Sequence, residues 1–99
     1  MHPDIDITSE REDSDVRVLL RREPFDLATN VLGLVDDTKR GRAIGVNPET
    51  VRTARRGGGV GEAFMSRTVA MLRRHRDLLV KVGVEPDLDG LFEVVEVKR

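Results

Sequence analysis

The sequence predicts an all-α fold, a compact bundle of about five helices preceded by a flexible acidic N-terminal arm. Two observations support this prediction. Apolar residues recur at steps of three and four through most of the chain, which is the period of one face of a helix. Proline, glycine and helix-capping residues interrupt that pattern where one helix would end and the next begin. With 99 residues and a mass of 11.1 kDa, the chain has the size of one small domain.

The N-terminal part divides into a leader and the start of the domain. Residues 1–13 combine Pro3 with alternating acidic residues and show no helical period, so they are expected to be flexible, and residues 14–99 form the domain. Ser14 can cap a short helix that follows it. The apolar residues of 16–20 also alternate as they would in a strand, and both possibilities stay open.

Three helices are expected next, each marked by a start signal and a stop signal. Proline fits the first turn of a helix, Asp and Asn side chains accept hydrogen bonds from its free amides, and glycine ends it. The expected helices are 24–32, between Pro24 and Gly33; 37–44, capped by Asp36 or Asp37 and ended by Gly45; and 48–56, started by Asn47 and Pro48.

A longer helix is expected after the glycines of 57–61, which break the pattern because each glycine in a helix costs about 1 kcal/mol relative to alanine. Apolar spacing predicts one helix over 62–82, with His75 on its apolar face, either partly buried or facing a dimer partner. A short helix from Leu88 that turns extended through 94–97 would complete the fold. The core residues expected from this part of the chain are Phe64, Met65, Met71 and Phe92.

The charges are distributed unevenly along the chain, although the formal net charge is only −1. Residues 1–15 hold six acidic residues and one basic residue, and residues 82–99 hold five acidic and two basic ones. Between them, residues 38–81 hold eleven basic and three acidic residues, a local charge of +8. Such a segment is typical of a nucleic-acid-binding surface, and an ordinary solvated face is the alternative.

Composition disfavours several other kinds of function. The chain has no cysteine, and His2 and His75 lie far apart, so neither a disulfide scaffold nor a metal site is expected. No nucleophile, base and orienting acid cluster in the sequence, so we expect no enzyme, no cofactor and no small-molecule ligand. No apolar run approaches the roughly 18 residues that span a bilayer, and the N-terminus lacks the features of a signal peptide, which predicts a cytoplasmic protein.

Residues 37–56, DTKRGRAIGVNPETVRTARR, have the pattern of a helix-turn-helix. Gly41 is small where the two helices would cross closely, and Gly45 permits a sharp turn. The apolar contacts that would lock the second helix against the first come from Ile44, Val46, Val51 and Ala54.

This pattern resembles the lambda-repressor-like (Cro/repressor, XRE) helix-turn-helix family. The resemblance is best over GRAIGVNPETVRTARR and continues more loosely over roughly 25–95, including LDGLFEVVE. Arg40 departs from it, because the family usually has an apolar residue there; the helix would be rotated, or Arg40 would extend its charge outward. A long helix after a glycine-rich connector also replaces the family's shorter fourth helix. The resemblance implies that helix 48–56 enters the major groove of DNA.

Given that placement, the side chains around this helix divide by spacing. Val51 and Ala54 would face inward, so the outer stripe faces the bases. The expected base contacts are Asn47, Glu49, Arg52, Thr53 and Arg56, and the expected phosphate contacts are Lys39, Arg42, Thr50 and Arg55. Arginine can donate two hydrogen bonds to guanine, whereas Asn47 has a simpler alternative role as a helix cap.

The sequence therefore predicts a sequence-specific, double-stranded-DNA-binding transcriptional regulator, with repression the expected effect. It would bind a palindromic operator as a homodimer, because linking two recognition helices multiplies affinity, and the interface would come from helix 62–82 or from the strand-like C-terminal residues. The alternatives are a protein-interaction module, such as an antitoxin-like partner, and an excisionase-like DNA architectural protein. The acidic ends would temper nonspecific DNA binding or steer the pose of the protein on DNA.

Overall fold

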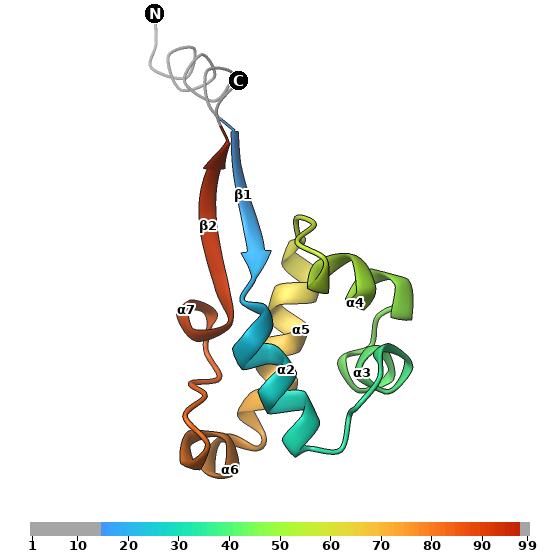
Figure 1. Cartoon of the computed structure of the whole chain (residues 1–99), viewed down its shortest axis with the longest axis vertical. Coiled ribbons are helices and arrows are strands. Elements are labelled where there is room, and N and C mark those ends of the chain that lie inside the picture. Colours follow the sequence, from blue (N-terminus) through green and yellow to red (C-terminus); the bar gives the residue numbers. More distant parts are fainter. Residues whose placement is uncertain (1–14, 98–99) are drawn as a thin grey trace, which may run out of the picture.

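The computed structural model describes residues 15–97 and shows a mixed α/β fold rather than an all-α bundle (Figure 1). The expected acidic leader, 1–13, lies outside the described residues. Six helices and a two-stranded antiparallel sheet make up the described part of the chain. In chain order they are β1 (Asp15–Leu20), α2 (Arg22–Val31), α3 (Asp37–Ile44), α4 (Pro48–Arg55), α5 (Glu62–Arg73), α6 (Arg76–Lys81), α7 (Leu88–Leu91) and β2 (Phe92–Val97).

The two strands form a ribbon that joins distant parts of the chain and stands out from the helices (Figure 1). Its register pairs Val18 with Val94 and Leu20 with Phe92. Leu20 and Phe92 are buried, so the base of the ribbon belongs to the core. The all-α prediction was wrong: of the two possibilities left open for 16–20, the strand is the one that forms. Its alternation was visible in the sequence, but the hydrogen bonds that stabilise it come from a partner far along the chain, which local periodicity cannot reveal.

The helices enclose a core centred on three phenylalanines. The ring of Phe64 on α5 lies 6.4 Å from the ring of Phe25 on α2 and 6.1 Å from that of Phe92, centroid to centroid. The second pair is nearly perpendicular, the edge-to-face geometry that aromatic rings favour. Burial of Phe64, Met71 and Phe92 confirms three of the expected core residues, and Met65 is half-buried at the edge of the core.

The single long helix expected over 62–82 is divided in two. α5 ends at Arg73 and α6 begins at Arg76, with a turn through Arg74 and His75 between them. His75 is exposed, so the expectation that its side chain would be partly buried on the apolar face was wrong. No glycine or proline marks this turn, and Leu72 and Leu79 on either side are both buried at a spacing that a straight helix would also allow.

None of the helices within residues 15–97 combines the length and the apolar character that crossing a membrane requires.

Candidate nucleic-acid interface

Helices α3 and α4 form a helix-turn-helix unit whose turn is built on Gly41. The backbone amides of Gly45 and Val46 both donate to the carbonyl oxygen of Gly41, at 2.7 and 2.9 Å. A Cβ atom on Gly41 would lie 2.7 Å from the carbonyl oxygen of Val46 and 3.2 Å from the nitrogen of Pro48, so only glycine fits here. Gly45 ends α3 with φ of +90°, a conformation that favours glycine.

The start of each helix is fixed by the residue that the sequence indicated. The carboxylate of Asp36 accepts a hydrogen bond from the amide of Lys39 at 2.8 Å and caps α3. The side-chain oxygen of Asn47 accepts from the amide of Glu49 at 2.7 Å and caps α4, and Pro48 occupies the first turn. The cap uses one oxygen of Asn47, so its side-chain NH₂ group stays available for another acceptor.

Helix α4 has a buried side and an exposed side, as its spacing predicted. Val51 and Ala54 are buried against the core. The residues expected to contact bases all lie on exposed positions, namely Asn47, Glu49, Arg52, Thr53 and Arg56. The structure therefore brings the five expected base-contacting residues together along one side of α4 and at its two ends.

Arg52 is held by two carboxylates within this surface. Its Nη1 donates to Oε1 of Glu49, one helical turn earlier, and its Nε lies 3.8 Å from Oδ2 of Asp37 on α3. The side chain is still 44% exposed. The sequence predicted Arg52 and Glu49 as two independent base contacts, whereas in the structure they bond to each other. A hydrogen-bond acceptor that binds Arg52 must therefore either displace Glu49 or bind the guanidinium in the orientation that Glu49 gives it.

Arg55 lies differently from the other residues expected at the interface. Its guanidinium donates two hydrogen bonds to Asp26 on α2, with Nε to Oδ1 at 2.8 Å and Nη2 to Oδ2 at 3.1 Å, and Nη1 donates to Asp37 at 3.3 Å. Only 21% of the side chain is exposed. Its expected role as a phosphate contact is therefore not supported, because its charge is used to tie α4 to α2 and α3.

The Asp26–Arg55 pair shifts the titration of both groups. Partial burial raises the pKa of Asp26, but hydrogen bonds and charge from Arg55, with help from Arg22 and Arg40, outweigh it and hold the pKa below its usual value. The hydrogen bond to Asp26 raises the pKa of Arg55 despite partial burial. Both groups are thus charged at neutral pH, and the pair fixes the orientation of α4.

Arg40 is buried, with only 4% of its surface exposed, so it neither rotates the helix outward nor extends its charge into solvent. It donates to Oγ1 of Thr29 at 2.9 Å, to Oδ1 of Asn30 at 3.0 Å and to Oδ1 of Asp37 at 3.2 Å. These partners accept the hydrogen bonds of the buried guanidinium, at a position where the lambda-repressor-like family usually has an apolar side chain. The sequence did not indicate this burial because the partners on α2 lie about ten residues away.

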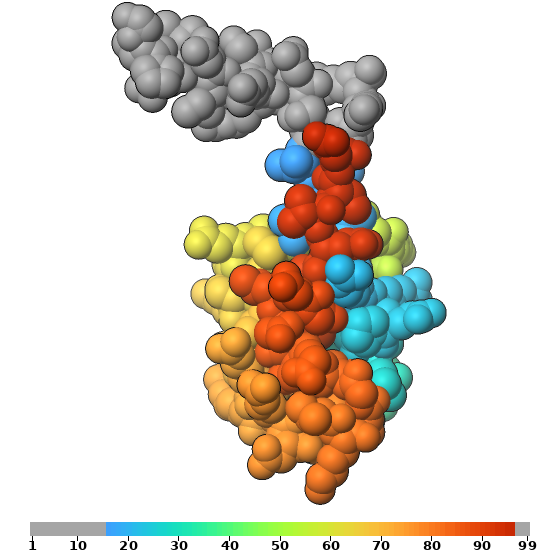
Figure 2. Space-filling model, turned by 90° about the vertical axis from the view of Figure 1, so that its left-hand side faces the viewer, coloured from blue at the N-terminus to red at the C-terminus, as the bar shows by residue number. Residues whose placement is uncertain are grey.

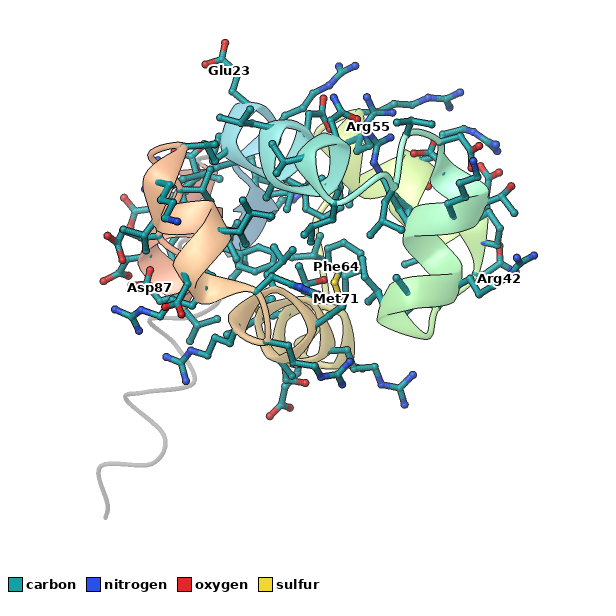
Figure 3. All side chains as sticks on the ribbon, turned by 90° about the horizontal axis from the view of Figure 1, so that it is seen from below. Glu23, Arg42, Arg55, Phe64, Met71 and Asp87 are labelled. Carbon is teal, nitrogen blue, oxygen red and sulfur yellow. The ribbon has the colours of Figure 1, made fainter. Side chains whose placement is uncertain are left out.

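The remaining expected phosphate contacts, Lys39, Arg42 and Thr50, are exposed. Figure 3 shows Arg42 pointing away from the helices at the edge of the molecule, whereas Phe64 and Met71 lie between helices. These positions leave Lys39 and Arg42 of α3 accessible to a polyanion, unlike the buried Arg40.

The glycine-rich connector after α4 packs closely against that helix. A Cβ atom on Gly58 would lie 2.7 Å from Cγ2 of Thr53, and the amide of Gly58 donates to the carbonyl oxygen of Thr53 at 3.0 Å. A hollow of about 400 Å³ lies between the connector and α4, bordered by Thr50, Thr53 and Gly59. The connector is thus part of the same surface as the exposed side of α4.

Two basic residues near this surface were not identified from the sequence. Arg17 on β1 is exposed, and its Cδ lies 3.9 Å from the position of a Cβ on Gly59. Arg67 on α5 donates from Nη1 to the carbonyl oxygen of Gly45 at 2.7 Å. Arg17 is placed here by a contact between distant segments, in which the amide of Val60 donates to the carbonyl oxygen of Val18 at 2.9 Å. Arg67 was counted in the basic segment without a location.

Within residues 15–97, no group of three or more acidic or histidine side chains is placed to hold a metal ion. The exposed surface of α3 and α4 carries hydrogen-bond donors and basic side chains together with the carboxylate of Glu49. Comparisons with protein-family models, curated proteins and solved structures found no match to the chain, so the resemblance to the lambda-repressor-like family stays a prediction that rests on residues 37–56.

Proposed function

We propose that the protein is a sequence-specific, double-stranded-DNA-binding transcriptional regulator that reads the major groove with α4. The observation that carries the proposal is the division of α4 into a buried side, formed by Val51 and Ala54, and an exposed side that presents Arg52, Thr53 and Arg56. Major-groove recognition needs a helix held rigidly by its inner side with polar side chains on its outer side. The ion pairs of Arg55 and the close crossing at Gly41 supply that rigidity.

The proposed contacts follow from exposure and charge. Asn47, Glu49, Arg52, Thr53 and Arg56 contact bases, and Lys39, Arg42 and Thr50 contact phosphate, with Arg17 added from the ribbon. Each neutralised phosphate releases condensed counterions, so affinity falls with salt by a log–log slope of about 0.9 per contact. The proposal extends to repression of transcription in the cytoplasm without a cofactor or ligand, and to a palindromic operator bound by two copies.

Selection of bound duplexes from a random pool tests this proposal. The wild-type protein should enrich one defined sequence, and Arg52→Ala should lose about 1–3 kcal/mol of discrimination at one base pair of each half-site. Arg73→Ala is the matched control, because Arg73 is an exposed arginine at the far end of α5, and it should enrich the wild-type sequence. Failure of the wild type to enrich any sequence would contradict the proposal.

A protein-interaction module is the second candidate, and one feature favours it. An open groove of about 730 Å³ runs between α5 and α7, with Met65, Val69, Ala70 and Leu88 on its apolar walls. Grooves with such walls suit apolar side chains of a partner protein. Under this function, Arg52→Ala would leave activity unchanged, whereas Val69→Glu, which places a charge in the groove, would abolish it.

A further inference from the structure

Asp37, the first residue of α3, contacts three arginines. Its Oδ1 accepts a hydrogen bond from Nη1 of Arg40 at 3.2 Å and another from Nη1 of Arg55 at 3.3 Å. Its Oδ2 lies 3.8 Å from Nε of Arg52. The side chain of Asp37 is only 13% exposed. One oxygen of this carboxylate is therefore fixed by two arginines, while the other oxygen faces a third.

The three arginines differ in their surroundings. Arg40 is buried, and Arg55 is largely covered and has Asp26 as its second partner. Arg52 is the most exposed of the three, and it alone belongs to the predicted base contacts. Asp37 thus connects the rigid inner side of α4 to a side chain on the exposed side of the same helix.

Arg52 lies between two carboxylates. Among residues 15–97, its ion-pair partners are Asp37 on the neighbouring helix and Glu49 on its own helix. Other carboxylates belong to α7 and β2, which form much of the face shown in Figure 2. Little of α3 and α4, in green, is visible on that face. The orientation of Arg52 therefore depends on Asp37 and Glu49.

These two contacts leave a defined set of free donors on Arg52. A guanidinium has one N–H group on Nε and two on each terminal nitrogen. Asp37 lies next to Nε, and Glu49 accepts from Nη1. The N–H groups that remain are all on the terminal nitrogens, one on Nη1 and both on Nη2. Guanine presents two neighbouring acceptors in the major groove, whereas adenine presents one acceptor and one donor. The free end of Arg52 therefore suits guanine.

We propose that Asp37 is a positioning residue for base recognition: it holds Nε of Arg52, so that Arg52 contacts guanine through Nη1 and Nη2 and is oriented before DNA binds. This inference rests on the proposed function, because it concerns the same surface. Immobilising a flexible side chain opposes binding, and a side chain that is already held avoids most of that loss. Asp37 thus raises the preference for guanine without touching DNA.

Selection of bound duplexes with Asp37→Asn tests this role, and Asp26→Asn is the matched control. Asparagine keeps one oxygen that accepts from Arg40 and Arg55, but its NH₂ group cannot accept from Nε of Arg52. Asp26→Asn weakens the anchoring of α4 through Arg55 without contacting Arg52. At the base pair that Arg52→Ala identifies, Asp37→Asn should lower the preference for guanine by about three- to tenfold, and Asp26→Asn should leave it unchanged.

Two further readouts separate positioning from a loss of structure. Removing a carboxylate near the phosphates removes repulsion, so Asp37→Asn should bind a nonspecific duplex at least as tightly as the wild type does. A merely loosened α4 would bind it more weakly. In the background of Arg52→Ala, Asp37→Asn should cause no further change at the identified base pair.

A measurement on the free protein needs neither DNA nor a variant. By NMR, Nε–H of Arg52 in the wild type should exchange with water more slowly than Nε–H of Arg73, an exposed arginine at the end of α5. The difference should be lost in Asp37→Asn and retained in Asp26→Asn.

The outcomes distinguish the inference from the proposed function. Equal exchange of Arg52 and Arg73 in the wild type would overturn the inference, and so would an enriched sequence whose guanine preference Asp37→Asn leaves unchanged. In the second case the proposed function would stand. A wild type that enriches no sequence would contradict the proposed function and the role of Asp37 in recognition together, even if the exchange rates show that Asp37 holds Arg52.

Discussion

Substituting Gly41 by alanine tests whether α3 and α4 cross as closely as the structure shows. In an open helix this change stabilises the protein by about 1 kcal/mol, because glycine is the poorer helix former. Here the added Cβ would lie 2.7 Å from the carbonyl oxygen of Val46, about 0.6 Å closer than an ordinary carbon–oxygen contact of about 3.3 Å. The neighbouring atoms belong to the backbone of Val46 and Pro48, so no side-chain rotation relieves the contact.

The expected result is a net loss of stability. Overpacking of this kind costs about 3 kcal/mol at the upper end of its usual range, and subtracting the gain in helix propensity leaves a net loss of about 2 kcal/mol. Urea unfolding followed by circular dichroism measures it, since the chain lacks tryptophan and tyrosine. Because relief of the contact moves α4 away from α3, the variant should also lose specific DNA affinity.

Gly61→Ala is the control for adding a methyl group to a glycine. Gly61 precedes α5 with an ordinary φ of −97°, and no heavy atom lies within 4 Å of the position of its Cβ. Its substitution should change the free energy of unfolding by less than about 1 kcal/mol. A Gly41→Ala variant more stable than the wild type would refute the close crossing of α3 and α4, because the gain in helix propensity would then be the only effect of the substitution.

Three further predictions, made with three substitutions and one truncation, test other features. Asp26→Asn should lower the free energy of unfolding by about 2 kcal/mol at neutral pH. Because the pKa of Asp26 is lowered in the fold, the contribution of its carboxylate to stability is present above the unfolded-state pKa of about 4 and is lost as the pH falls through the folded value. Urea unfolding should therefore show the difference between Asp26→Asn and wild type shrinking below about pH 4. Arg40→Ala should lower the free energy of unfolding by about 3 kcal/mol, and Arg40→Met, which keeps most of the side-chain volume, should lower it clearly less. Equal losses in thermal or urea unfolding would contradict this expectation and would show that the hydrogen bonds to Thr29, Asn30 and Asp37 contribute more than the packed volume. Deleting residues 1–12, which hold four acidic residues and one basic residue, should tighten binding to a nonspecific duplex in a fluorescence-anisotropy titration, and an unchanged dissociation constant would count against a role for the acidic leader.

Local signals in the sequence were sufficient for the helix-turn-helix unit. Asp36, Gly45 and the Asn47–Pro48 pair each act on backbone groups within four residues of themselves, so their roles follow from residue type and position alone. The inward direction of Val51 and Ala54 follows from helical spacing in the same way. These features describe the exposed side of α4, on which the proposed function depends.

Features that depend on distant residues could not be predicted. Arg55 looked like a phosphate contact because nothing near it in the sequence suggests its partner Asp26, which lies 29 residues earlier. The burial of Arg40 depends likewise on Thr29 and Asn30 of another helix. The turn at His75 has no breaker residue and is decided by how the two helices pack on the core.

The ribbon also has a consequence for the order in which the protein folds. Asp15 and Val97 pair although 82 positions separate them, so closing the ribbon costs about 4 kcal/mol of chain entropy, far more than forming the turn between α3 and α4. Contacts of long sequence separation form late and open first. Amides of Arg17 and Val95 should therefore exchange with solvent faster than those of α4, and folding should pass through a state in which the helix-turn-helix is formed while the ribbon is still open.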